Sequence, residues 1–222
     1  MRRAGVHVAA QPMSEIEKRE RFTSRLEAFS DLVFGFSLSL LATRLDVPAR
    51  VEDIFDPARW LAVIVTFALV CRFWLEHYRT FRHGFVAEIF DAVLNFVFLF
   101  GIAILPYSLQ TFLRFPGFLP SFALYAGDFS LIFFSLTLLR VRSLRQRRSD
   151  PDFGHRLREW RRCVIQFGIA LLMLALLLAL KLHGGTFESG MSAFSYYFLG
   201  LFLALVMFTR RRVLGLPRFL AA

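Results

Sequence analysis

The sequence predicts an all-α, polytopic membrane protein with six transmembrane helices per subunit. Two observations support this fold class. Hydrophobic residues make up 56% of the 222 residues, and 28 residues are phenylalanine, which is more than one globular core of this size needs. The mean hydropathy is +0.53. A lipid bilayer is therefore the expected solvent for most of the chain, because a helix of about 17 to 25 apolar residues can span it.

Several apolar windows have the length of a membrane span. They lie at 29–45, 60–77, 89–109, 119–139, 163–182 and 192–209. Short connections that contain proline or glycine separate these windows, and both residue types end helices. We expect a cytoplasmic N-terminal segment over 1–23, one transmembrane domain over 24–210 and a cytoplasmic tail over 211–222.

The first predicted helix has a start signal of its own. Ser24-x-x-Glu27 matches a capping box, in which each side chain accepts a hydrogen bond from the other residue's backbone N–H. We therefore expect this helix to begin in the cytoplasm and to continue without a break into the membrane.

Positive charge predicts the orientation in the membrane. Most of the 27 Lys and Arg lie at alternate connections, namely 1–28, 78–88, 140–162 and 210–222, whereas the other three connections hold only five. The positive-inside rule then places both termini in the cytoplasm. We expect the cytoplasmic arginines to contact anionic lipid head groups. We expect no nucleic-acid partner, because no recognition motif accompanies the net charge of +10.

Polar residues from three predicted helices share the cytoplasmic level of the membrane. The first helix supplies Arg25, Ser30 and Asp31, the end of the second supplies His77, and the start of the third supplies Asn95. Polar side chains in hydrocarbon must find partners. Either these residues form one hydrogen-bonded network, or each of them reaches interfacial water.

Two acidic residues inside the predicted spans need partners as well. Glu76 follows Arg72 by four residues, so the two are expected to pair along the second helix. Asp128 lies within the fourth window. It is either a midplane site for a proton or a cation, or a residue near the outer interface beside Tyr125.

Three short motifs follow one another along the first three predicted helices. They are Arg25-x-x-x-Phe29-Ser30-Asp31-x-Val33-Phe34, then Phe73-Trp74-x-x-His77-x-x-x-Phe81, and then Leu94-Asn95 followed by Leu105-Pro106-Tyr107-Ser108. In order, spacing and topology they resemble the transmembrane protein 175 family, which contains lysosomal potassium channels of animals and shorter, single-repeat bacterial homologues. The resemblance covers roughly residues 20 to 140.

This resemblance implies a homotetramer in which the first helix of each subunit lines a central potassium pathway, with no cofactor besides the permeant ion. Position by position, the pore-facing residues are Phe36, Leu40 and Thr43 with Ser39 beside them, and potassium would bind transiently near Leu40 and Thr43. The motif residues would stabilise this helix; they are Arg25, Phe29, Ser30, Asp31, Trp74, His77 and Asn95. From spacing alone, Phe36 and Leu40 share one face that could equally pack against the second and third helices.

The chain departs from the family at the pore. Leu32 stands where the family commonly has glycine, and Phe36 and Thr43 replace isoleucine or leucine. A ring of phenylalanines would either plug the pathway or attract a cation to the ring faces. Because an apolar constriction gates by dewetting, small rotations of the first helix would open or close it.

Other function classes remain as alternatives. We expect no enzyme, because the chain has neither a His-Glu-x-x-His zinc motif nor a Gly-x-Ser-x-Gly nucleophile elbow. A secondary transporter coupled to protons or cations would use Asp128, and a non-conducting structural membrane protein would have Phe36 as its plug. In each case the expected location is the cell membrane, and the short single-repeat relatives indicate a bacterial inner membrane.

Overall fold

The computed structural model describes residues 14–43, 50–55, 57–82, 85–115, 118–146 and 153–182, and most of these residues are helical. The long helices are α1 (Glu15–Thr43), α2 (Pro57–Phe81), α3 (Ile89–Arg114), α4 (Leu119–Gln146) and α5 (Phe153–Leu182), and a short 3-10 helix, η1 (Val51–Phe55), precedes α2. The predicted all-α class is confirmed for this part of the chain.

Four of the first five apolar windows fall within one of these long helices, and the first, 29–45, follows α1 to its end at Thr43, with residues 44 and 45 outside the described ranges. Among the described residues, four helices are long and apolar enough to cross a membrane: α1, α3, α4 and the part of α5 from Leu157 to Ala179. The chain is therefore a multi-pass membrane protein, as the composition predicted. The sixth window at 192–209 and the predicted tail over 211–222 lie outside the described residues, as does most of the predicted segment over 1–23.

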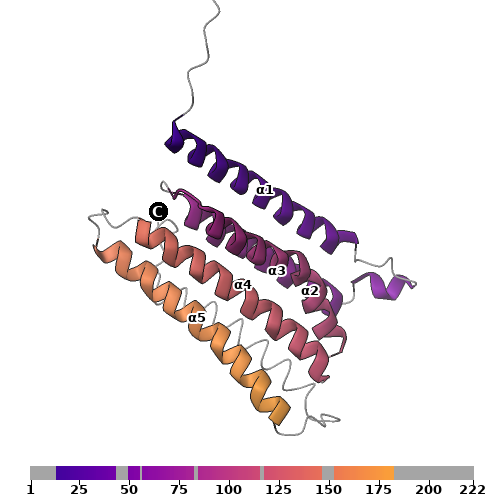
Figure 1. The fold of residues 1–222 in the computed structure, drawn as a ribbon. Helices are drawn as coiled ribbons and strands as arrows, with labels where there is room; N and C mark the ends of the chain where they lie inside the picture. The colour runs from indigo at the N-terminus through magenta and orange to yellow at the C-terminus, as the bar shows by residue number, and fades with distance from the viewer. Residues whose placement is uncertain are drawn as a thin grey trace, which may run out of the picture.

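The helices run up and down in one bundle, with α1 and α5 on opposite sides and α3 and α4 between them (Figure 1). α1 packs against α2 and α3, and α4 packs against α3 and α5. Because α1 lies on the outside, only one stripe of it is buried in the subunit. This stripe consists of Thr23, Leu26, Ser30, Phe34, Ser37 and Leu41.

The centre of the bundle is apolar and closely packed. Phe73 of α2 meets Phe129 and Phe133 of α4 edge to face, with ring centroids 6.0 and 5.5 Å apart. Gly101 lets α3 and α4 approach closely, because a Cβ atom at this position would lie 2.6 Å from Cγ1 of Ile132. These contacts hold α2 and α3, against which α1 packs, to α4.

The start of α1 differs from the prediction. The capping box is formed by Ser14 and Glu17: the Ser14 N–H donates to Glu17 Oε2 at 2.9 Å, and the Glu17 N–H donates to Ser14 Oγ at 3.2 Å. Ser24 lies inside the helix and is exposed, so the capping box predicted at Ser24 is wrong. The Ser-x-x-Glu pattern occurs at both places. The helix continues back to the first of them because the intervening residues, mostly Glu, Lys and Arg, favour helix.

Candidate functional site: the exposed face of α1 and its polar anchor

The four residues assigned to the pore lie on the side of α1 that the subunit leaves largely open. Phe36 is 65% exposed, Ser39 and Thr43 are also exposed, and Leu40 is half-buried. Steps of three and four residues keep these side chains within one stripe of the helix. Phe36 therefore does not pack into the core formed with α2 and α3, which was the alternative that spacing alone left open. We call this stripe the open face of α1.

On the opposite side of α1, a chain of buried side chains joins three helices. Asn95 Nδ2 of α3 donates to Ser30 Oγ of α1 at 2.9 Å, and Asn95 Oδ1 lies 2.7 Å from His77 Nε2 of α2. Ser30 and Asn95 are fully buried, and His77 is 3% exposed. Since the Asn95 amide nitrogen donates to Ser30, its oxygen is the acceptor, and His77 Nε2 carries the proton. We call Ser30, Asn95 and His77 the polar anchor.

Phenylalanine rings hold the His77 imidazole in place. The ring stacks on Phe81 with centroids 4.5 Å apart and on Phe98 at 5.4 Å, and Phe34 approaches at 5.8 Å. Aromatic pairs at these separations favour defined geometries. The imidazole therefore has little freedom to turn Nε2 away from Asn95.

The other motif residues lie beside the polar anchor. Asp31 is exposed, and its Oδ1 accepts a hydrogen bond of 2.8 Å from Trp74 Nε1. Phe29 meets Phe96 edge to face, with centroids 5.7 Å apart. Arg25 is exposed and forms no ion pair with any acid in the described ranges.

The structure thus divides the five residues of the predicted network. Ser30, Asn95 and His77 are joined directly, whereas Asp31 bonds to Trp74 and Arg25 stands apart. The physical reason is helical geometry, because successive residues on an α-helix point about 100° apart. Ser30 faces α3 and the adjacent Asp31 cannot face the same partner.

A buried ion pair between α2 and α4 was not predicted. Arg140 Nη2 lies 2.5 Å from Glu76 Oε2, and the Arg140 and Glu76 side chains are 3% and 7% exposed. Arg140 also donates to Gln166 of α5 at 3.0 Å and lies 3.7 Å from Glu159. The sequence pattern indicated Arg72 as a partner of Glu76. Arg72 does attract the Glu76 carboxylate, and Arg140 and, at 3.1 Å, Arg79 form ion pairs with it.

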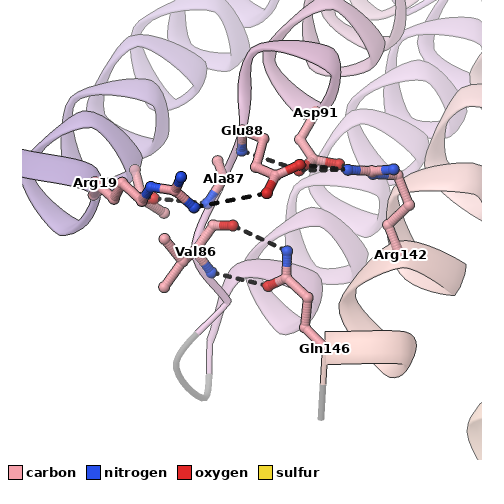
Figure 2. A network of polar contacts seen from close by, with 8 residues as sticks. Arg19, Val86, Ala87, Glu88, Asp91, Arg142 and Gln146 are labelled. Atoms are coloured by element: carbon pink, nitrogen blue, oxygen red, sulfur yellow. Dashed lines mark hydrogen bonds and ion pairs between the residues drawn. The ribbon is translucent and has the colours of Figure 1, made fainter. Parts of the chain in front are cut away.

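The same end of the bundle carries a second set of polar contacts, which Figure 2 shows. Glu88 and Asp91 cap the start of α3 and both pair with Arg142 of α4, and Glu88 also lies 3.6 Å from Arg19 of α1. The Gln146 side-chain amide makes two hydrogen bonds to the backbone of Val86. Its Oε1 accepts from the Val86 N–H at 3.1 Å, and its Nε2 donates to the Val86 carbonyl at 3.0 Å. Charged contacts thus link α1, α3 and α4 at the end that the charge pattern assigns to the cytoplasm.

Asp128 lies inside the subunit, towards the other end of α4. It is 7% exposed, and its Oδ2 accepts a hydrogen bond of 2.6 Å from Ser108 of α3. Its Oδ1 has no hydrogen-bond partner among the described residues. Tyr125 is fully buried as well. Within the ranges that the structure describes, no group of three or more His, Cys, Asp or Glu could hold a metal ion.

Comparison with known proteins covers the part of the chain that builds the open face and the polar anchor. Residues 25–106 match the model of a family described as endosomal/lysosomal potassium channel TMEM175. A protein of Marivirga tractuosa named "Potassium channel" is 28% identical over 115 residues, which cover 51% of this chain and 44% of that protein. The matched region therefore spans less than half of the relative's length.

Proposed function

We propose that the chain is a member of the TMEM175 family, whose model residues 25–106 match, and that it is a potassium-permeable cation channel. In this proposal four subunits assemble with the open faces of α1 around a central axis, and potassium passes down its electrochemical gradient. An ion channel is not an enzyme, and we assign no catalytic activity to the chain. The proposed location is the cell membrane of a bacterium.

The open face of α1 is the observation that carries the proposal. Phe36 exposes 65% of its surface although the opposite stripe of the same helix is buried. A face that combines Phe36 with Ser39 and Thr43 suits a narrow pathway, because it supplies both an apolar constriction and oxygen atoms. Assembly of four copies would cover this face without changing the contacts of α1 with α2 and α3.

The hydroxyl groups on the open face have a useful orientation. Ser39 Oγ donates to the Gly35 carbonyl at 3.0 Å, and Thr43 Oγ1 donates to the Leu40 carbonyl at 2.9 Å. Each hydroxyl hydrogen is therefore directed back to the helix, and the oxygen lone pairs remain available. Oxygen lone pairs can replace part of the hydration shell of potassium. We place the transient ion near Leu40 and Thr43 for this reason.

The remaining parts of the proposal follow the charge pattern. We propose six membrane helices per subunit with both termini in the cytoplasm. The end that contains Arg140, Arg142 and the contacts of Figure 2 then faces the cytoplasm. Arginines near this interface would attract anionic lipid head groups at about 1 kcal/mol each. The polar anchor holds α1 in register at this level.

Potassium flux into liposomes tests the proposal. The full chain is reconstituted, and potassium uptake driven by a membrane potential is compared for the wild type, Phe36→Ala and the control Phe100→Ala. Phe100 is an exposed phenylalanine of α3 outside the open face. We expect flux in the wild type, a higher rate for Phe36→Ala because the constriction widens, and no change for Phe100→Ala.

Three outcomes would contradict the channel. These are absence of flux in both the wild type and Phe36→Ala, equal effects of the two alanine variants, and flux that requires a proton gradient. The last result would favour the transporter alternative. For that alternative the buried Asp128 would be the first residue to replace.

A further inference from the structure

The buried stripe of α1 contains three hydroxyl residues at intervals of seven: Thr23, Ser30 and Ser37. Seven residues make nearly two helical turns, so the three side chains point in one direction. Each of them bonds to α3 or to the residues that lead into it. Thr23 accepts from the Ala87 N–H at 2.8 Å, Ser30 accepts from Asn95 at 2.9 Å, and Ser37 donates to the Ile102 carbonyl at 2.8 Å.

The Ser37 bond differs from the other two in its direction. Thr23 and Ser30 donate their own hydroxyl hydrogens to the α1 backbone, at the carbonyls of Arg19 and Leu26. Ser37 instead donates to the backbone of the neighbouring helix. A serine hydroxyl in a helix can satisfy itself locally through a carbonyl of its own helix, so this bond to α3 needs a separate explanation.

Pro106 of α3 provides the explanation. In a regular α-helix the Ile102 carbonyl accepts the N–H of residue 106, but proline has no N–H and interrupts the helix hydrogen bonds at this turn. Ser37 and Ile102 are both fully buried, so water does not replace the missing donor. A buried carbonyl without a donor is costly. The Ser37 hydroxyl supplies the hydrogen bond that Pro106 removes.

We propose that Ser37 is the positioning residue of the pore helix: by bonding to the carbonyl freed by Pro106, it fixes the rotation and the height of α1 at the level of Phe36 and Leu40. This inference rests on the proposed function. Ser37 follows Phe36 directly and points about 100° away from it. Holding Ser37 against α3 therefore keeps Phe36 on the open face. A rotation of α1 large enough to withdraw Phe36 would break the bond to Ile102.

A set of variants tests this role through the bond itself. Ser37→Ala removes the donor, Ser37→Thr keeps a hydroxyl, and Pro106→Ala restores an N–H to the Ile102 carbonyl. Ser135→Ala is the matched control, because Ser135 is a buried serine whose hydroxyl bonds only to carbonyls of its own helix. Each variant is reconstituted as the full chain and measured for potassium flux. Each is also combined with Phe36→Cys to measure disulfide cross-linking between subunits.

We expect Ser37→Ala to lower flux and the cross-linking yield by about fivefold, roughly the effect of one buried hydrogen bond on an equilibrium between two helix orientations. Ser37→Thr and Ser135→Ala should stay near the wild type. In the Pro106→Ala background the Ser37→Ala change should lower flux and yield less than twofold, because the carbonyl then has its own donor.

Equal losses from Ser37→Ala with and without Pro106→Ala would overturn the inference, as would unchanged flux and cross-linking in Ser37→Ala tetramers. Absence of flux from the wild type would contradict the proposed function instead. The cross-linking yields would still decide whether Ser37 orients α1. Absence of cross-links from every Phe36→Cys protein would contradict both proposals, because Phe36 would then lie away from its copies in the other subunits.

Discussion

Replacement of Asn95 by leucine tests how strongly the polar anchor holds α1. Asn95 is fully buried and makes two hydrogen bonds between helices, one to Ser30 and one to His77. Leucine has a similar branched shape but no polar group. The change therefore removes both bonds and leaves the His77 Nε2 proton without an acceptor. Ser30 is affected less, because its hydroxyl keeps the Leu26 carbonyl as acceptor.

The expected loss of stability follows from these contacts. Hydrogen bonds between membrane helices contribute about 0.6 kcal/mol on average and about 1.7 kcal/mol at most. Two lost bonds then lower the free energy of unfolding by about 1 to 3 kcal/mol. Adding His77→Leu removes the unpaired imidazole as well. The double variant should therefore lose less stability than the sum of the two single variants, by about 1 kcal/mol.

The measurement is unfolding of the purified full chain in mixed micelles with SDS, at one protein concentration, followed by far-UV circular dichroism. Gln110→Leu is the control, since Gln110 is a half-buried amide of α3 for which the described residues provide no hydrogen bond. The reasoning would be refuted if Asn95→Leu cost no more than Gln110→Leu. Additivity of Asn95→Leu and His77→Leu within about 0.3 kcal/mol would refute it too.

Two further changes test contacts that the sequence did not predict. Glu76→Gln leaves the buried Arg140 guanidinium without its closest carboxylate and should destabilise the subunit by about 3 kcal/mol. In the same unfolding assay the exposed control Glu15→Gln should have no measurable effect. Equal effects of the two changes would contradict the idea that burial makes the Glu76 ion pair important. Gly101→Ala should cost about 1 to 3 kcal/mol because its Cβ would overlap Ile132. In a protein that already carries Ile132→Ala, Gly101→Ala should no longer cause this loss, and if it still does, the overlap is not the cause. Gly127→Ala, with open space around its Cβ, should not destabilise the subunit.

The sequence predicted those features that depend on hydrophobic length and depth in the membrane. Five apolar windows coincide with the long helices, because burial in lipid and hydrogen bonding within each helix decide their position together. The meeting of Ser30, Asn95 and His77 is part of one of the two alternatives that the sequence left open, for a related reason. Three polar groups at one depth in adjacent helices have few other partners.

The features that sequence reasoning missed depend on which helices are neighbours. Glu76 pairs with Arg140, a residue far along the chain, and no local spacing identifies that partner. Sequence reasoning did not single out the hydrogen bond of Ser37, because its acceptor is a backbone carbonyl on another helix. A signal did exist in Pro106, which frees one buried carbonyl and so requires a donor from a packed neighbour. The start at Ser14 was missed because two equivalent Ser-x-x-Glu patterns competed.

The contacts of α1 also limit how the proposed pore could open. Rotation of α1 alone would break the bonds of Thr23, Ser30 and Ser37 to the α3 segment. Three such bonds together are worth about 2 to 5 kcal/mol, so a rotated α1 would be populated at no more than about 3%. The end of the bundle near Arg19 and Glu88 opposes rotation of α1 less strongly, because this ion pair is exposed to water. Opening of the proposed pore would therefore require α1 and α3 to move as one unit.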